Sequence, residues 1–271
     1  MSVQDLRIVI TGGAVGIGAC TAKVAASRGA KVVVSDLNDE AGQSLVDEIQ
    51  TAGGQATYQH ADVTVDEDVR ALMSAAEDAF GGIDVLHNNA GIHESMISQD
   101  LSLESMTRET FETVMGVNVL GVWLCAKYAL PHLKKSDNAS IINAGSTSSL
   151  SGYPQCLAYG ASKGGVMQLT KMLAVDLASS GIRVNCYCPG SIHTQIVDNF
   201  LRAAPDPAAM LNTMTMTHLI PRMGQPQDVA ELVCFLASPE SAFVNGAIWT
   251  IDGGSLAWRG TLDVLGMEAK H

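Results

Sequence analysis

The alternation of short β-branched runs with amphipathic stretches constrains the fold of this chain more than any other feature of its sequence. Seven runs predict strands, over residues 7–10, 31–35, 55–60, 84–88, 140–144, 183–188 and 247–251. Strands that alternate with helices pair in parallel through right-handed crossovers, and helices cover both faces of the sheet. Because there is no low-complexity linker and no internal repeat, we expect a single α/β domain over residues 1–271, built on a doubly wound parallel sheet.

One helix shows its pattern most clearly. Its apolar residues recur every three or four positions, at Val69, Leu72, Met73, Ala76 and Phe80. Thr64, followed three residues later by Glu67, matches a capping box. We therefore expect a helix that begins directly after Thr64 and ends near Phe80.

Two segments depart from the alternation. Residues 191–222 carry three prolines and several methionines without a strand pattern, which predicts an irregular substrate lid or, alternatively, a peripheral helix packed by methionines. Residues 255–271 form a C-terminal extension that could cover another subunit or close a pocket. Its apolar residues are Leu256, Trp258, Leu262, Val264 and Leu265.

The composition excludes several classes of protein. The chain has 16 basic and 28 acidic side chains, and this net charge of −12 argues against nucleic acid as a partner. No uninterrupted apolar stretch reaches the roughly 18 residues of a membrane span, and the start does not resemble a secretion signal, so we expect no membrane and a cytoplasmic location. The six cysteines and seven histidines lack the spacing of ligands, so we expect free thiols and no metal.

A glycine-rich loop, TGGAVGIG at residues 11–18, follows the first predicted strand and leads into a helix. Gly12, Gly16 and Gly18 would let the backbone turn tightly and approach a pyrophosphate closely. The amides and the positive dipole end of the following helix favour that anion. The loop therefore predicts a dinucleotide site.

Asp36 ends the second predicted strand, 18 residues beyond Gly18. A carboxylate there can accept hydrogen bonds from the adenosine ribose hydroxyls, and it would repel a 2′-phosphate. Its neighbours Val15 and Leu37 supply no compensating cation. The pattern favours NAD over NADP, with the alternative that Asp36 is only a solvated residue at a strand end.

Tyr159 and Lys163 lie four residues apart near the start of a predicted helix, so they share one face. A cation about 4 Å from the phenol, at an effective dielectric near 20, contributes about 4 kcal/mol, enough to lower the pKa of a tyrosine from about 10 to about 7. Tyr159 could then act as a general acid/base. Taken alone, the same spacing is typical of a surface pair.

Together and in this order, the motifs resemble the short-chain dehydrogenase/reductase family over nearly the whole chain, residues 7–254. The resemblance implies a Rossmann-like fold and NAD(P)-dependent oxidoreductase activity. The matching elements are the glycine loop, Asp36, Asp62-Val63, NNAG at 88–91, Asn118, Ser146, YGASK at 159–163, Pro189-Gly190 and residues 252–254.

The resemblance implies roles for individual residues. Tyr159 would be the acid/base, and Lys163 would lower its pKa and bind the nicotinamide ribose. Ser146 would hydrogen-bond the substrate oxygen, and Asn118 would support a water-linked proton relay. The implied cofactor contacts are Gly12, Val15, Gly16, Ile17, Gly18, Asp36, Leu37, Asp62, Val63, Asn89, Ala90, Gly91, Tyr159, Lys163, Pro189, Gly190, Ile192 and Thr194.

The substrate pocket is less constrained by the sequence. Gly145 stands where many members of that family have a serine, which should enlarge or loosen the pocket. The expected pocket residues, besides the lid, are His93, Ser148, Tyr153, Gln155 and Cys156. They are mostly neutral, and of the nearby cations only Arg202 and Arg222 could hold an anion. We therefore expect an uncharged cyclic, aromatic or steroid-like alcohol.

The leading hypothesis is an NAD-dependent oxidoreductase that interconverts a secondary alcohol and its ketone. A 3-oxoacyl thioester reductase is an alternative, which Asp36 and the acidic net charge disfavour, and a non-catalytic dinucleotide-binding sensor or scaffold is another. We also expect a homotetramer, because only 16% of the residues are charged and one apolar helix face requires cover. That face consists of Val166, Leu169, Leu173 and Leu177.

Overall fold

The computed structural model describes residues 2–258 and 260–267, and within them seven strands form one parallel sheet. The spatial order is β3-β2-β1-β4-β5-β6-β7. The strands are β1 (Arg7–Thr11), β2 (Lys31–Asp36), β3 (Gln55–His60), β4 (Val85–Asn88), β5 (Ser140–Ala144), β6 (Arg183–Pro189) and β7 (Ile248–Ile251). The predicted Rossmann-like α/β fold is confirmed, and each predicted strand lies within about one residue of its predicted bounds.

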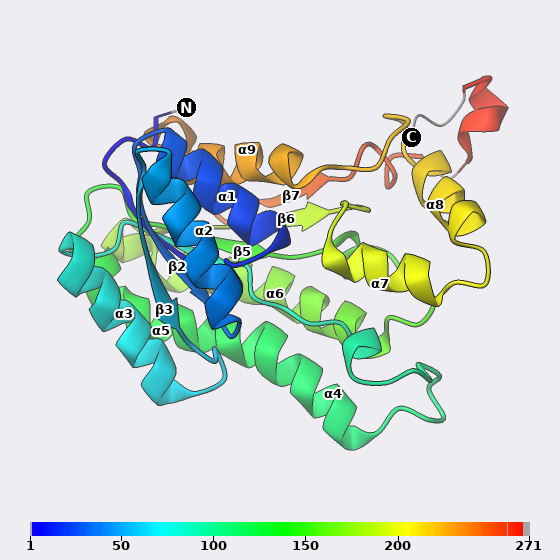
Figure 1. Cartoon of the computed structure of the whole chain (residues 1–271), viewed down its shortest axis with the longest axis horizontal. Coiled ribbons are helices and arrows are strands. Elements are labelled where there is room, and N and C mark those ends of the chain that lie inside the picture. The colour runs from blue at the N-terminus through cyan, green and yellow to red at the C-terminus, as the bar shows by residue number, and fades with distance from the viewer. Residues whose placement is uncertain (1, 259, 268–271) are drawn as a thin grey trace.

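Helices cover both faces of this sheet (Figure 1). On one face lie α1 (Gly16–Ser27), α2 (Asp39–Thr51) and α9 (Pro226–Ala237); on the other lie α3 (Asp66–Phe80), α5 (Gly121–Leu133) and α6 (Leu157–Asp176). Neighbouring residues of β2 divide between the two cores, with Val32 and Val34 in the first and Val33 in the second. A strand buried on both faces needs such a continuous apolar run.

The expected capping box at the start of α3 is wrong. The helix begins at Asp66, and its cap residue, Val65, contributes no side-chain hydrogen bond. Thr64 instead donates its hydroxyl to Asp62 Oδ1 at 2.7 Å, and the Thr64 N–H donates to the same oxygen at 2.8 Å. This turn centred on the Asp62 side chain occupies the hydroxyl of Thr64, which therefore does not cap the helix.

A long apolar helix crosses the second layer. It consists of α4 (Arg108–Met115), a π-helical turn (Gly116–Leu120) and α5, and over Arg108–Leu133 its length and composition would suffice for a membrane span. Core helices meet the same criterion. In this protein the helix contributes Leu124 and Leu133 to the core beneath the sheet.

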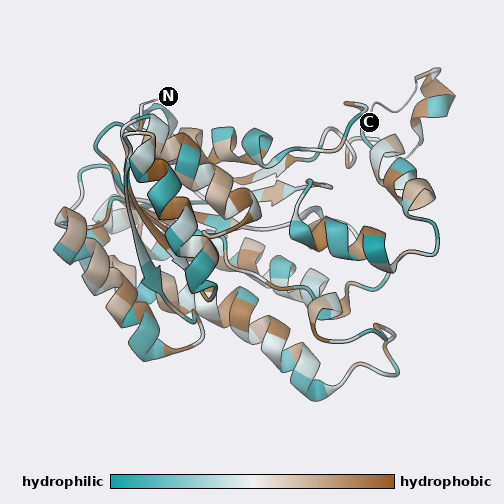
Figure 2. Cartoon of the chain, in the orientation of Figure 1, coloured by the Kyte–Doolittle hydropathy of each residue, from teal (hydrophilic) through white to brown (hydrophobic). Residues whose placement is uncertain are grey.

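Residues 191–222 contain two helices, as the alternative of a peripheral helix anticipated, so the expectation of an irregular segment is wrong. They form α7 (Gln195–Ala203) and α8 (Pro207–Met216), which extend beyond the end of the sheet (Figure 1). Pro207 starts α8 rather than interrupting it, and Asp206 caps that helix by accepting the N–H of Ala209 at 3.0 Å. Hydrophobic and hydrophilic residues alternate along α7, as expected for a helix with one covered face (Figure 2).

Short 3₁₀ helices complete the fold. They span Glu94–Met96, Thr147–Ser149, Ala178–Ser180, Pro239–Ser241 and Leu262–Leu265. The last belongs to the C-terminal extension, where Leu262 is buried and Val264 is exposed. Residues 268–271 of that extension lie outside the described residues.

The helix face that suggested an oligomer is already covered within one subunit. Val166 of α6 and Leu177 directly after it are buried, Leu173 packs against the second core, and Leu169 is half-buried. Most of that face is therefore covered by the subunit itself and gives an oligomer little support. The exposed large apolar residues of α6 are Leu157 at its first position and Met172 and Val175 near its end.

Candidate active site

The glycine loop connects β1 to α1 with a backbone that only glycine adopts readily. Gly12 and Gly16 have φ of +59° and +57°, and a Cβ on Gly12 would lie 2.7 Å from the Cα of Ala90. Val15, which precedes α1, provides no side-chain cap. The amides of the first helical turn are therefore left available to an anion, as a dinucleotide pyrophosphate would require.

Asp36 stands beside this loop at the carboxyl end of β2. Its Oδ2 accepts the N–H of Ala14 at 3.0 Å, and its Oδ1 accepts the N–H of Asn38 at 3.1 Å. Its neighbours Val15 and Leu37 are apolar, and these residues are 46% and 62% exposed. The carboxylate is thus fixed at the loop with no cation next to it in the chain.

The NNAG segment after β4 binds the same loop from the other side. Asn89 donates its side-chain amide to the carbonyls of Gly12, at 2.7 Å, and Thr11, at 3.1 Å. A Cβ on Gly91 would lie 3.1 Å from Lys163 Nζ and 3.2 Å from Asn118 Oδ1. Gly91 therefore lets the segment pass directly over two of the predicted catalytic side chains.

Asn118 lies in the π-helical turn and is fully buried. Its Oδ1 accepts the N–H of Ile92 and its Nδ2 donates to the carbonyl of Ile92, both at 2.9 Å. The same Nδ2 donates to Ser162 Oγ at 2.8 Å, and Ser162 donates in turn to the carbonyl of Tyr159 at 2.7 Å. Asn118 thus connects the NNAG segment to the helix that carries Tyr159.

Lys163 is buried at the centre of the site and donates to the carbonyl of Ala144, at the end of β5, at 2.8 Å. Its Nζ lies 5.6 Å from the centre of the Tyr159 ring, so the two side chains share one face of α6 as predicted. Burial lowers the pKa of Lys163 to about 8. The ammonium is predominantly charged at neutral pH and is lost as the pH rises above 8.

The expected low pKa of Tyr159 is wrong for the protein chain alone. Burial raises the pKa of Tyr159 to about 12, and it outweighs the hydrogen bond with the Ser146 side chain, which acts in the opposite direction. The expectation assumed an ammonium 4 Å from the phenol. Lys163 instead directs its ammonium toward the carbonyl of Ala144.

Ser146 begins the 3₁₀ turn after β5, with the N–H of Ser148 donating to its Oγ at 3.1 Å. Since the oxygen accepts that bond, the hydroxyl proton is left to donate toward Tyr159 or a substrate oxygen. The structure therefore brings Ser146, Tyr159, Lys163 and Asn118 together at the carboxyl ends of β4 and β5.

Comparisons with known proteins agree with this arrangement. The family model described as enoyl-(acyl carrier protein) reductase matches residues 12–255. The cis-4-hydroxycyclohexanecarboxylate dehydrogenase of Sinomonas cyclohexanicum is 39% identical over 92% of this chain and 96% of its own length. The cyclohexanol dehydrogenase of Acinetobacter sp. strain SE19 is 37% identical over 90% of this chain and 92% of its own length. The L-fucose dehydrogenase of Oryctolagus cuniculus is 38% identical over 92% of this chain and 84% of its own length.

The chain belongs to the short-chain dehydrogenase/reductase family. The family binds nicotinamide dinucleotides, and the glycine loop fits one, since its free amides and its close approach to Ala90 form a cradle that a side chain would fill. Thr194 also lies beside that loop, because a Cβ on Gly16 would be 3.6 Å from Thr194 Cγ2. Val63, by contrast, is buried against Gly121 of α5.

The predicted substrate residues lie in two adjoining places, which are joined by a contact of 3.4 Å between His93 Nε2 and Cys156 Sγ. Ser148, Tyr153 and Cys156 line a hollow of about 420 Å³ beside the start of α6. His93 instead lies beneath α7, with its ring 4.9 Å from both the Tyr159 ring and the Phe200 ring. Gln155 is exposed and is not among the residues that line the hollow.

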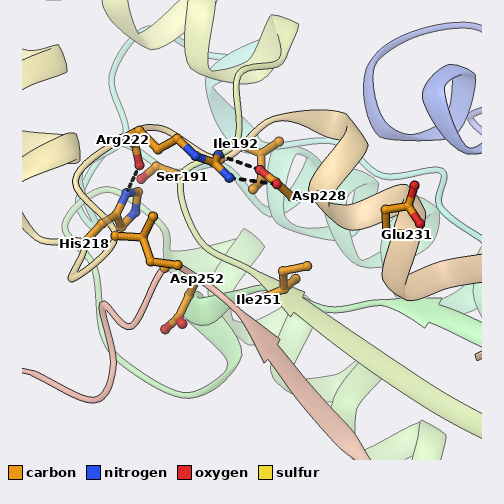
Figure 3. A pocket seen from close by; sticks show the side chains of 11 residues that line it. Ser191, Ile192, His218, Arg222, Asp228, Glu231, Ile251 and Asp252 are labelled. Carbon is orange, nitrogen blue, oxygen red and sulfur yellow. Dashed lines mark hydrogen bonds and ion pairs between the residues drawn. The ribbon is translucent and has the colours of Figure 1, made fainter. Parts of the chain in front are cut away.

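A second hollow, of about 270 Å³, lies beside the Pro189–Thr194 turn (Figure 3). Ser191 and Ile192 line it, together with His218, whose Nδ1 bonds the Arg222 carbonyl at 2.8 Å. The Arg222 guanidinium pairs with Asp228 at 2.6 Å. Arg222 is therefore already neutralised by a carboxylate, and this hollow contains none of the four catalytic positions.

Gly145 does not enlarge the substrate pocket, so that prediction is wrong. A Cβ at this position would point into the core, 2.7 Å from Cys186 Sγ, 2.8 Å from Cys188 Sγ and 3.0 Å from the carbonyl of Tyr187. The two thiols, on one face of β6, occupy the volume that a side chain at 145 would need. All six cysteines are free, and both of these are buried.

Four residues of the site were not predicted from the sequence: two thiols, one phenylalanine and one buried carboxylate. The thiols of Cys186 and Cys188 were visible only as an i, i+2 pair in a strand, which was a usable signal for one shared face. Phe200, which covers His93, carried no signal beyond an apolar residue in α7. Glu94 was overlooked because nothing in its local sequence marks a buried carboxylate.

We predict that Gly145→Ala lowers the free energy of unfolding by about 1–3 kcal/mol, the usual cost of overpacking a filled core. Replacing both thiols in the same chain, by Cys186→Ala and Cys188→Ala, should reduce that cost, because only the Tyr187 carbonyl then stays close. Urea unfolding of the four proteins measures the coupling. Gly164→Ala, with open space around its Cβ, is the matched control, and additive effects would contradict the prediction.

Proposed function

We propose that this protein is an NAD-dependent dehydrogenase that interconverts a secondary alcohol on an uncharged ring and its ketone. Asp36 carries the cofactor part of the proposal, because its carboxylate is fixed on the glycine loop between two apolar neighbours and would repel a 2′-phosphate. The ring alcohol is supported by the names of two relatives, the cyclohexanol and cis-4-hydroxycyclohexanecarboxylate dehydrogenases, of which the first also supports an uncharged substrate and the second supports the ring alone.

The residues that would hold the dinucleotide surround the carboxyl ends of β1, β2, β4 and β6. The loop amides would bind the pyrophosphate, Asp36 the adenosine ribose, and Ile192 with Thr194 the carboxamide. Bound there, the dinucleotide would supply the acceptor for the hydride that the alcohol carbon loses on oxidation.

Side chains of the protein transfer the hydroxyl proton of the alcohol. During oxidation Tyr159 in its phenolate form takes the hydroxyl proton of the alcohol and becomes a phenol, and the Ser146 hydroxyl donates a hydrogen bond to the substrate oxygen. In the reverse direction Tyr159 returns the proton to the ketone oxygen. Because the chain alone holds the pKa of Tyr159 at about 12, the phenol is protonated at neutral pH, and oxidation should accelerate as the pH rises.

The remaining expectations concern the pocket and the location. Phe200 places α7 over His93 and Tyr159, which supports a role for α7 in enclosing the substrate. We keep the prediction of a neutral pocket, since Arg222 pairs with Asp228. A cytoplasmic location stays a prediction.

A homotetramer also remains our proposal. Its support is now a different surface, on the outer sides of the π-helical turn, α5 and α6, where four large apolar side chains are between 42% and 71% exposed. They are Leu120, Trp123, Met172 and Val175. Light scattering should give about four times the chain mass of 28.4 kDa, and a monomer at micromolar concentration would rule the proposal out.

The cofactor proposal predicts the behaviour of Asp36→Ala. The unmutated protein should reduce NAD with cyclohexanol far more efficiently than it reduces NADP, as followed by the absorbance of reduced nicotinamide. The variant should lose roughly 10- to 100-fold of that preference, since a hydrogen bond to a charged group contributes about 1.5–3 kcal/mol. Asp47→Ala, on the exposed side of α2, should leave it unchanged, and equal turnover of the two cofactors before mutation would refute the proposal.

The acid/base proposal predicts the behaviour of Tyr159→Phe. This change removes the phenol oxygen and keeps the ring, so NADH binding, measured by fluorescence, should survive while turnover falls by roughly 10²- to 10⁴-fold. Lys163→Ala should weaken both, and Lys163→Arg should rescue little, because a planar guanidinium does not replace a compact ammonium. Substantial oxidation by Tyr159→Phe with an unchanged pH profile would mean that another group moves the proton.

A further inference from the structure

Glu94 is a fully buried carboxylate in the 3₁₀ turn that follows the NNAG segment. Its Oε1 accepts the N–H of Ala158 at 3.1 Å, and its Oε2 accepts the N–H of Tyr159 at 3.0 Å. The side chain therefore reaches across 65 positions of sequence to bind the backbone of the acid/base residue itself. Both carboxyl oxygens therefore act as acceptors for backbone amides of one helix.

These two bonds supply what α6 lacks. The first amides of a helix have no partner within the helix, and a side chain at the cap position commonly accepts one of them. In α6 that position is Cys156, which makes no side-chain cap bond. Glu94 takes over this function from a different part of the fold, and its negative charge is also favoured at the positive end of the helix dipole.

Among the described residues, no lysine or arginine pairs with Glu94, and the only ion-pair candidate is His93, whose Nδ1 lies 3.7 Å from Oε2. That nitrogen accepts the N–H of Ser95 at 3.0 Å, so it carries no proton, and burial lowers the pKa of His93 further. The two backbone amides are therefore the main compensation for burying the charge, which ties the carboxylate closely to their position.

Glu94 also completes the support of Tyr159. The carbonyl of Tyr159 accepts from Ser162, which Asn118 holds, and its N–H donates to Glu94. The segment that carries Glu94 is joined at its other end to the glycine loop through Asn89. One short stretch of chain thus connects the cofactor loop to both polar groups of the Tyr159 backbone.

We propose that Glu94 is a positioning residue for the reaction, which holds the backbone of Tyr159 at the height where its phenol meets the substrate oxygen. The proposal rests on the acid/base function proposed above for Tyr159. Glu94 is fully buried, and it positions Tyr159 through the two backbone amides that it binds.

The electrostatic environment gives the proposal a second consequence. The titratable groups that face Tyr159 are His93, Glu94, Cys156, Lys163, Tyr187 and Cys188. Burial is the main cause of the raised pKa of Tyr159, and Glu94 acts in the same direction, because a nearby anion disfavours phenolate. Removing this charge should therefore lower the pKa of Tyr159.

Hydrogen exchange resolved to single amides tests the anchor without any activity measurement. Ala158 and Tyr159 lie in the first turn of α6, where amides ordinarily exchange freely, yet both should be protected in the unmutated protein. Glu94→Gln keeps the size of the side chain but offers one acceptor instead of two, so it should expose at least one of these amides by roughly tenfold or more. Free exchange of both amides before mutation would overturn the proposal.

Kinetics then separate positioning from mere stabilisation of the fold. Glu94→Gln should lower kcat for alcohol oxidation by roughly 10- to 100-fold, the scale of a small misplacement, with little change in KM for NAD. The alkaline rise of kcat should also move to lower pH. Glu104→Gln, at an exposed position of the same connection, is the matched control and should leave both properties unchanged.

The outcomes distinguish this inference from the proposed function. A normal kcat in Glu94→Gln, or a reduced kcat whose pH profile does not move, would show that the carboxylate only stabilises the fold. If the unmutated protein oxidises no ring alcohol with either cofactor, the proposed function fails, and the exchange of the Tyr159 amide still decides whether Glu94 anchors it.

Discussion

A sheet that is covered by helices on both faces leaves only its edges open to other molecules, and this constraint organises the whole protein. All seven strands run in parallel, so their carboxyl ends meet at one edge. Asp36 ends β2, the NNAG segment begins at the end of β4, Ser146 follows β5, and the Pro189–Thr194 turn begins at the end of β6. Residues more than a hundred positions apart become neighbours because the sheet collects them.

The polar groups at this edge are held mainly by backbone amides and carbonyls rather than by one another. Asp36 is fixed by the N–H of Ala14, Lys163 by the carbonyl of Ala144, and Asn118 by both polar groups of Ile92. Backbone groups in a tightly packed sheet have little freedom, so such bonds transmit the rigidity of the fold to the side chains.

Much of the fold and of the candidate site could be predicted from the sequence, because both depend on local patterns. The strand KVVVS and the glycine loop can each be recognised from one continuous stretch of sequence. The π-helical turn around Asn118, the contact between Phe200 and His93 and the burial of Glu94 could not be predicted, since each depends on how distant elements pack. The pKa of Tyr159 was misjudged for a related reason, because spacing along a helix reveals shared position but not the desolvation that accompanies it.

The thiols beside Gly145 have a consequence for how this chain could have diverged from its relatives. A glycine and two cysteines about forty positions away share one volume, so the effect of a substitution at 145 depends on the residues at 186 and 188. A lineage that moves between glycine and a larger residue there must first make room on β6, or pass through a poorly packed intermediate. Positions 145, 186 and 188 should therefore vary together across the family, because a larger residue at 145 requires smaller residues on β6.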